Sequence, residues 1–202
     1  MNDFFEQWPK EARWFIIGGM ADTNEAIQVK QRFSEVQCLG IEPNPLYVNQ
    51  QRTMGFPGTL LEGALWDEPG MGILKRPSNA TWASASLCRP DVAPDMNGEW
   101  ELEDQLVVPL QTLDAIHVEH GPLDDIVLWL DVEYAEIKSL LGAVNLFREG
   151  RVLMVNVETY AHANLSYIVD FLFRHGLTLR KVWNTKGPMD AQDYIFKMEE
   201  DR

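Results

Sequence analysis

The chain has 202 residues, of which 46% are hydrophobic, and its formal net charge is −14 at pH 7. This length and composition predict one globular domain over residues 1–202. The negative charge disfavours nucleic acid and anionic lipid as partners, because it repels phosphate. The sequence has no apolar run of about 18 residues, and its N-terminus is acidic where a secretory signal is basic and then apolar. We therefore expect a cytoplasmic protein that does not contact a membrane.

The first third of the chain alternates strand and helix patterns. A short N-terminal helix with Phe4, Phe5 and Trp8 is expected to cap the core. The following elements are predicted as strand 14–17, helix 22–33, strand 36–42, helix 44–54 and strand 58–66. Asn44 and Pro45 suit the N-cap and first position of their helix. Nearly continuous apolar strands in this order indicate a parallel sheet with helices on both faces.

Residues 67–105 interrupt this alternation with a segment rich in Gly, Pro, Asn and Ser. A connection of this length is usually functional or disordered. Within it, residues 70–76 have a β pattern, and residues 82–87 are expected to form a flap.

The remainder of the chain returns to alternating elements. The predicted elements are a strand and short helix over 106–121, buried strand 124–133, helix 135–147, strand 151–159, helix 163–176, and strands 177–184 and 190–198. The last two strands suit an antiparallel hairpin at the end of the parallel sheet. The predicted fold class is therefore α/β, with a mostly parallel sheet and an antiparallel C-terminal strand.

The segment from Trp14 to Ala26 places two glycines, Gly18 and Gly19, between an apolar strand and a polar helix start. Glycine in such a turn lets the backbone approach a ligand. The fingerprint G-x-G-x-x-G is absent, which argues against a nicotinamide enzyme. Glu42 ends the second strand roughly twenty residues later, where an acid accepts hydrogen bonds from ribose hydroxyls in related folds. The alternative is that Glu42 only caps the next helix or lies in solvent.

A series of motifs between Trp14 and Glu158 carries a family resemblance. In chain order these are "IEPNP", "EGALWDEPG", "VPLQTLDAI" and "LWLDVEYAEIKSLLGA". Together they resemble the FkbM family of S-adenosylmethionine-dependent methyltransferases. The resemblance implies the class I methyltransferase (Rossmann-like) fold, a seven-stranded sheet with an antiparallel last strand, and S-adenosylmethionine as cofactor.

The resemblance also implies where the cofactor lies. Gly18 and Gly19 match the glycine turn beside the methionine part, Glu42 matches the acid that binds the ribose, and Ala64 matches the stretch near the adenine. Residues 82–86 match a serine-rich stretch that folds over the cofactor. A solvated loop is the alternative for this stretch.

The strand-end motif "LDVE" supplies two further residues. Asp131 matches the acid near the transferred methyl group, and Glu133 matches the second acid of the motif. The chain departs from the family pattern at three positions. Ile16 replaces the first acid of D-x-G-A-N-x-G-D, no second spaced glycine follows, and Tyr134 replaces the glycine of "DVEG". Asp22 is the candidate to replace the missing acid as a partner of the cofactor's ammonium group, and Tyr134 is expected to wall the pocket.

The candidate catalytic residues are Asp131, Glu133 and Glu158, with His162 as a weaker candidate. A carboxylate near the methyl group serves as the base for a hydroxyl acceptor. Two or three carboxylates at this edge also suit magnesium, although no metal ligand is assigned. The structural alternatives are that Glu133 caps the next helix and that Glu158 pairs with a basic side chain.

The sequence therefore predicts a methyltransferase that O-methylates a small hydroxylated acceptor, either a sugar or glycan unit or a secondary metabolite. Acceptor identity follows from the resemblance alone. The competing hypothesis is a binding protein that keeps the methyltransferase fold and has lost catalysis or the cofactor.

Overall fold

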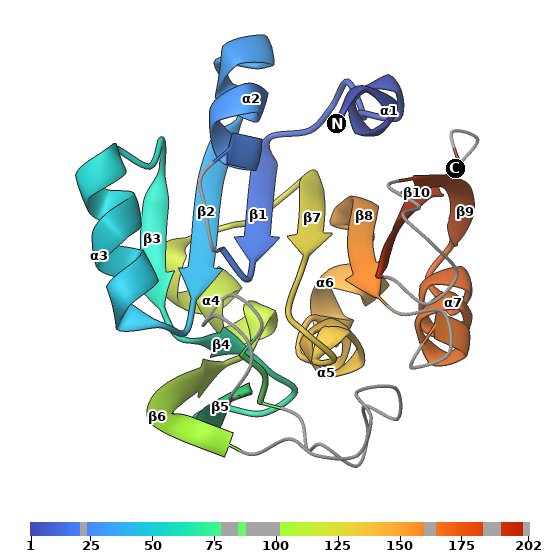
Figure 1. Ribbon diagram of the computed structural model, residues 1–202. Coiled ribbons are helices and arrows are strands. Elements are labelled where there is room, and N and C mark those ends of the chain that lie inside the picture. Colours follow the sequence, from blue (N-terminus) through green and yellow to red (C-terminus); the bar gives the residue numbers. More distant parts are fainter. Residues whose placement is uncertain (21–23, 78–84, 88–101, 160–164, 184–190, 200–202) are drawn as a thin grey trace.

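The computed structural model describes residues 1–20, 24–77, 85–87, 102–159, 165–183 and 191–199. Within these residues the central sheet has seven strands (Figure 1), and their spatial order is β3 (Thr59–Glu62), β2 (Gln37–Glu42), β1 (Trp14–Gly18), β7 (Ile126–Leu130), β8 (Val152–Thr159), β10 (Gln192–Met198) and β9 (Leu177–Trp183). The strands from β3 to β8 pair in parallel, and β10 runs antiparallel to both β8 and β9. The predicted fold class and the predicted terminal hairpin are confirmed.

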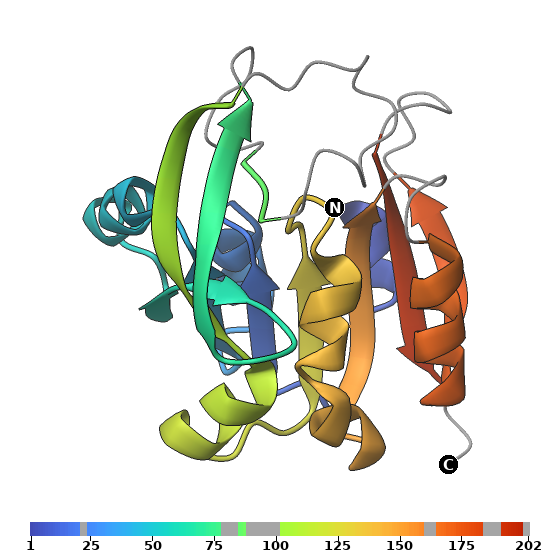
Figure 2. The same ribbon diagram turned by 90° about the horizontal axis from the view of Figure 1, so that it is seen from below.

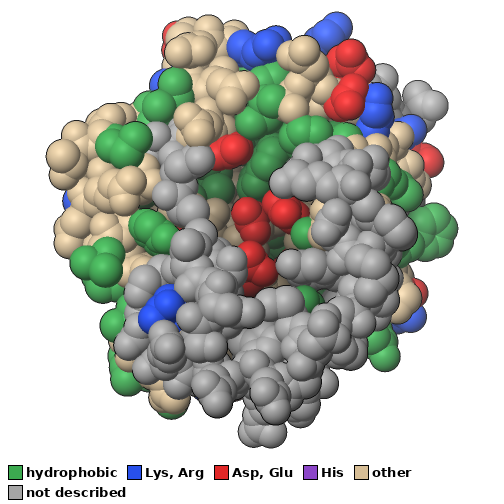
Figure 3. All heavy atoms as spheres, in the orientation of Figure 1, with side chains coloured by type: hydrophobic (Ala, Val, Ile, Leu, Met, Phe, Trp, Pro, Cys, Tyr) green, Lys and Arg blue, Asp and Glu red, His purple; other side chains and the backbone are tan. Residues whose placement is uncertain are grey.

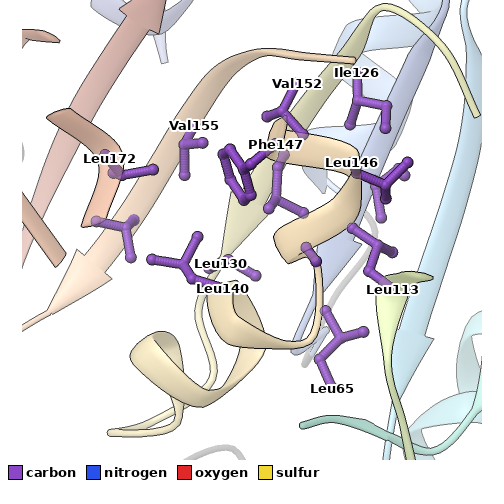
Figure 4. Close-up of a cluster of buried hydrophobic side chains, with 14 of the residues drawn as sticks. Leu65, Leu113, Ile126, Leu130, Leu140, Leu146, Phe147, Val152, Val155 and Leu172 are labelled. Atoms are coloured by element: carbon purple, nitrogen blue, oxygen red, sulfur yellow. The ribbon is translucent and has the colours of Figure 1, made fainter. Parts of the chain in front are cut away.

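Helices cover both faces of this sheet. One face packs against α1 (Asn2–Glu6) and α2 (Asn24–Arg32), and the other packs against α4 (Leu113–His120), α5 (Glu136–Leu141), α6 (Val144–Arg148) and α7 (Leu165–Arg174). The strands alternate accordingly, since Phe15 and Ile17 face the α1 side while Ile16 faces the other core. Figure 4 shows part of this second core, where Leu140 and Phe147 lie near Leu130.

The N-terminal helix α1 closes the core on its face of the sheet, as predicted. Phe4 is completely buried, and its ring contacts Trp8 and Trp129 edge to face at centroid distances of 5.6 and 4.9 Å. Such aromatic pairs add stabilisation beyond the apolar area that they bury. The described part of the chain contains no helix that is both long and apolar enough to cross a membrane.

Helix α3 (Pro45–Met54) begins and ends as its sequence predicts. The Asn44 side chain accepts a hydrogen bond from the Leu46 N–H at 3.0 Å, and Pro45 occupies the first turn. Gly55 ends the helix in the left-handed conformation at φ 79°. This helix lies beside β2 and β3, so the start of α3 is next to the end of β2.

The predicted strand 58–66 divides at Gly63. Its last part, β4 (Ala64–Leu65), belongs to a second sheet with β6 (Leu102–Gln111) in the centre and β5 (Gly70–Pro77) at the far edge. The small sheet lies at the carboxyl ends of the central parallel strands (Figures 1 and 2). Of the predicted flap, residues 85–87 are described, and Ser86 pairs with Lys75 of β5 through two backbone hydrogen bonds.

The predicted helix 135–147 is wrong in its continuity, because it breaks into α5 and α6. A side chain at Gly142 would place its Cβ 2.0 Å from the Trp66 carbonyl oxygen, so the chain passes this point only with glycine. The Asp114 carboxylate then accepts hydrogen bonds from the N–H groups of Asn145 and Leu146, both at 3.1 Å. These bonds satisfy N–H groups at the start of α6 that a continuous helix would have used internally.

Candidate active site

The glycine turn after β1 packs directly against the end of β7. Gly19 has φ 79°, and a Cβ on it would lie 1.7 Å from the Asp131 carbonyl oxygen. The Gly19 N–H donates to the Ile41 carbonyl, and the Asp131 N–H donates to the Gly18 carbonyl, each at 3.0 Å. Backbone packing therefore requires glycine at position 19 even before a ligand is considered.

Glu42, at the end of β2, is held by two backbone donors. Its Oε2 accepts from the Met20 N–H and its Oε1 accepts from the Asn44 N–H, both at 2.7 Å. The side chain is 5% exposed. Burial raises the pKa of Glu42 to about 7, and the two backbone hydrogen bonds oppose that rise. Glu42 thus connects the glycine turn to the start of α3, and does not extend into solvent.

A pocket lies over the turn and Glu42. Its apolar walls come from both sheets and from the flap segment, and include Ile41, Ala64, Leu65, Leu74 and Leu87. Its acidic lining residues are Glu42, Asp131 and Glu133. We call this the first pocket. It combines an apolar slot with convergent polar groups, as small-molecule sites commonly do.

A second pocket lies on the α2 side of the contact between Gly19 and Asp131. Its lining includes Met1, Ile17, Asn24, Gln28, Trp129 and Trp183, together with the carboxyl side chains of Glu25, Asp131, Glu158 and Asp193. Gly19, Met20 and Asp131 line both pockets. The two pockets therefore share part of their lining around the end of β7, and in this sense they meet there.

Carboxyl groups are concentrated where the pockets meet. Figure 3, drawn in the orientation of Figure 1, shows acidic side chains gathered in a hollow at the centre of the visible face. Burial, followed by the charges of Glu158, Glu133, Asp193 and Glu136, raises the pKa of Asp131 well above its ordinary value. Burial and then Glu158 raise the pKa of Glu133 to about 7. Glu133 therefore exchanges protons near neutral pH, as general acids and bases do.

Glu136 contributes to this group from the first turn of α5. It is 1% exposed, and its Oε1 accepts from the Tyr134 N–H at 2.9 Å. Burial raises its pKa from 4.5 to about 8, with the charges of Glu133 and Glu158 adding to the rise. The folded state therefore holds a proton on Glu136 that the unfolded chain loses above about pH 4.5.

This difference in pKa predicts a loss of stability with rising pH. Between about pH 4.5 and 8 the folded chain binds more protons than the unfolded chain, so the free energy of unfolding falls by up to about 1.4 kcal/mol per pH unit per proton. In Glu136→Gln the amide oxygen keeps the Tyr134 contact and no proton is required. We expect urea unfolding to show a more stable protein at pH 8 and a shallower decline from pH 5 to 8.

In the Glu136→Gln variant the free energy of unfolding should still fall somewhat with rising pH, because the pKa values of Asp131 and Glu133 are also raised. The matched control is Glu119→Gln on the exposed end of α4, which should leave the pH dependence unchanged. An unaltered slope in Glu136→Gln would contradict the assignment.

The turn after β7 has an unusual backbone. Glu133 and Tyr134 are consecutive non-glycine residues with positive φ, at 47° and 71°. Ser86 of the flap segment donates its hydroxyl to the Glu133 carbonyl at 2.5 Å. The glycine that the family has in place of Tyr134 suits this left-handed position. Tyr134 is buried but is not among the residues that line either pocket, contrary to the expected wall.

The structure brings most of the sequence-predicted site together. Gly19, Glu42, Ala64, Asp131 and Glu133 line the first pocket, and Glu158 lines the second. Gly18 lies beneath them in β1, where a Cβ would be 2.7 Å from a methyl group of Leu65. Asp22 and His162 lie outside the described residues, as do Trp82 and Ser84 of the expected flap. Ile16, in place of the family's first acid, is fully buried in the core.

Sequence reasoning missed Asp193 and the two tryptophans of the second pocket. A signal for Asp193 existed, because β10 is antiparallel and its first residues must lie beside the carboxyl ends of the parallel strands. Among the described residues, no group of three or more His, Cys, Asp or Glu side chains is arranged to hold a metal ion.

Comparison with solved structures places the fold among methyltransferases. A precorrin-6y C5,15-methyltransferase from Geobacter metallireducens GS-15 matches 97% of this chain and 85% of its own, at 12% identity and a TM-score of 0.53. A human methyltransferase 10 domain containing protein matches 98% of this chain and 77% of its own, at 7% identity and a TM-score of 0.51. At these identities the likeness concerns the fold alone.

A search of the curated proteins finds no match. The family model described as the methyltransferase FkbM domain matches residues 19–178, which include the ends of β2 and β7 and most of the lining of both pockets. The chain therefore belongs to the FkbM family of methyltransferases, which use S-adenosylmethionine as the methyl donor.

Proposed function

We propose that the protein is an O-methyltransferase, which transfers the methyl group of S-adenosylmethionine to a hydroxyl of a small acceptor such as a sugar, a glycan unit or a secondary metabolite. The observation that carries the proposal is that one carboxyl group, Asp131, lines two neighbouring pockets. Methyl transfer requires donor and acceptor to be aligned in line, and neighbouring pockets that share this residue suit such a pair.

The first pocket fits the cofactor. Both oxygens of Glu42 already accept a backbone N–H, and each retains a lone pair for a ribose hydroxyl. Ile41, Ala64 and Leu65 offer an apolar slot for the adenine. Asp131 and Glu133 would face the cationic methionine end. When bound, the cofactor supplies an electrophilic methyl group on a positively charged sulfur.

The carboxyl side chains of this chain would handle the proton of the acceptor. Asp131 lines both pockets, and its raised pKa makes its anionic form a stronger base than an ordinary carboxylate. We assign it the acceptor's hydroxyl proton. Glu133, in the first pocket, and Glu158, in the second, raise the pKa of Asp131 by their charge. Trp129 and Ile17 limit the access of water on the second side.

Calorimetric titration with S-adenosylhomocysteine, compared with NAD, tests the cofactor. Binding of the first compound and not the second is expected, and no heat from S-adenosylhomocysteine would overturn the proposal. Mass spectrometry of reactions with sugar and phenol acceptors then tests catalysis, through a product heavier by one CH₂ group. Cofactor binding without transfer to any hydroxyl would favour a binding protein that keeps the fold.

A further inference from the structure

The second pocket has a composition that its role in hydroxyl methylation does not require. Carboxyl side chains reach it from α2, from the turn after β7, from β8 and from β10, and two indoles form part of its wall: Glu25, Asp131, Glu158, Asp193, Trp129 and Trp183. The indole rings of Trp129 and Trp183 meet edge to face at a centroid distance of 6.0 Å. The pocket is thus a cavity with both acidic and aromatic walls.

Asp193 is oriented by a chain of two side-chain hydrogen bonds. Trp183 donates its Nε1–H to Asn156 Oδ1 at 3.1 Å, and Asn156 donates its Nδ2–H to Asp193 Oδ1 at 2.8 Å. Asn156 is completely buried, and Asp193 is 1% exposed. In the sheet, Asp193 lies opposite Glu158 on one side and opposite Trp183 on the other. The last three strands thus place a buried carboxylate beside a second acid and an indole.

Carboxylates beside aromatic rings are the groups with which proteins bind ammonium ions. An ammonium donates three hydrogen bonds, and the face of an indole attracts a cation through its quadrupole. A neutral polyol gains less from such a wall, because it can donate hydrogen bonds to the carboxylates but carries no positive charge for them or for the indole face to attract. We propose that the acceptor carries an ammonium group, which Asp193 and Glu158 bind beside Trp183 while a hydroxyl of the same molecule takes the methyl group. This substrate class, an amino alcohol or amino sugar, rests on the proposed function.

The chemistry of the step agrees with this division of roles. A protonated amine has no lone pair, so the nitrogen is anchored and the hydroxyl oxygen is the nucleophile. The oxygen forms a bond to the methyl carbon as the carbon–sulfur bond breaks and its electron pair stays on sulfur, which yields S-adenosylhomocysteine. The hydroxyl proton passes to Asp131, where the two pockets meet.

Paired probes test the preference for ammonium. Ethanolamine is compared with ethylene glycol, and glucosamine with glucose, by calorimetric titration of the protein with and without saturating S-adenosylhomocysteine. Saturation ensures that the cofactor's own ammonium site is filled. We expect each amine to bind at least tenfold more tightly than its neutral counterpart, with an affinity that falls as salt is added. Equal affinities in both pairs, or no binding by either amine, would overturn the proposal.

Two variants locate the site. Asp193→Asn and Glu158→Gln should each reduce amine affinity toward that of the neutral probe while S-adenosylhomocysteine affinity is retained, and the second variant serves if the first does not fold. Exposed Glu119→Gln is the matched control, with unchanged amine affinity. Amine binding that persists in both variants would place the ammonium elsewhere and refute the assignment. If S-adenosylhomocysteine does not bind, the loss of amine affinity in Asp193→Asn and Glu158→Gln relative to Glu119→Gln, measured without cofactor, still tests the ammonium site separately from the proposed function.

Discussion

Replacing Asp131 by asparagine is expected to lower kcat for methyl transfer by about 10²–10⁴-fold, the usual contribution of a positioned general base. The amide keeps the shape of the side chain and cannot accept the hydroxyl proton. The backbone of Asp131 continues to pack against Gly19, because that contact involves its carbonyl group. Single-turnover kinetics with the acceptor found by mass spectrometry would measure the effect.

Cofactor binding separates this chemical role from a structural one. S-adenosylhomocysteine carries no charge on its sulfur, so its affinity for the Asp131→Asn variant should stay close to that of the parent protein. S-adenosylmethionine should lose more affinity, because its sulfonium loses a nearby anion. Activity that survives in Asp131→Asn would refute the assignment of the base, and loss of S-adenosylhomocysteine binding would indicate damage to the pocket instead.

Replacing Glu42 by glutamine is expected to weaken S-adenosylhomocysteine binding by about 10- to 150-fold. This range corresponds to the loss of one hydrogen bond to a charged acceptor, about 1.5–3 kcal/mol. The amide nitrogen would also oppose one of the two backbone donors, from Met20 or Asn44, that now bind the carboxylate. Calorimetric titration measures the change directly.

Glu62 provides a matched control, since it lies opposite Glu42 in the parallel register of β2 and β3 and is exposed to solvent. Glu62→Gln should leave the affinity unchanged. The parent protein should also bind S-adenosylhomocysteine more tightly at pH 8 than at pH 6, because the pKa of Glu42 is about 7 and its anion is the better acceptor. Glu42→Gln should reduce this pH dependence to the part that Glu133 contributes. If Glu42→Gln and Glu62→Gln bind S-adenosylhomocysteine with equal affinity, Glu42 does not contact the ribose.

The parts of the fold that follow from local pattern were predictable. Strand patterns located the strands of the central sheet, while their number followed from the family resemblance. Asn44, Pro45 and Gly55 set the limits of α3 through capping preferences. Placement of Glu42 and Asp131 at one edge followed from parallel strands, whose carboxyl ends share that edge. These predictions needed only the period of the strands and their order along the chain.

The features that were missed depend on contacts between distant segments. The break at Gly142 lies where the Trp66 carbonyl approaches the backbone, and nothing in the sequence of the helix indicates that neighbour. Glu133 and Tyr134 adopt positive φ against their own local preference, because the end of β7 and Ser86 fix the turn. Asp193 joins the site through an antiparallel strand more than sixty residues beyond Asp131, so its position follows from the direction of that strand and from no local motif.

The wall between the two pockets has a practical consequence for engineering. Among the residues that the structure describes, only Gly19, Met20 and Asp131 line both pockets, and the Gly19–Asp131 contact is made by backbone atoms. Asn24, Gln28 and Trp183 belong to the second pocket alone. Under the proposed assignment of donor and acceptor to the two pockets, a mutant library at these three positions would vary the range of acceptors and leave the donor site unchanged. Selection for a new substrate would then start from full cofactor affinity.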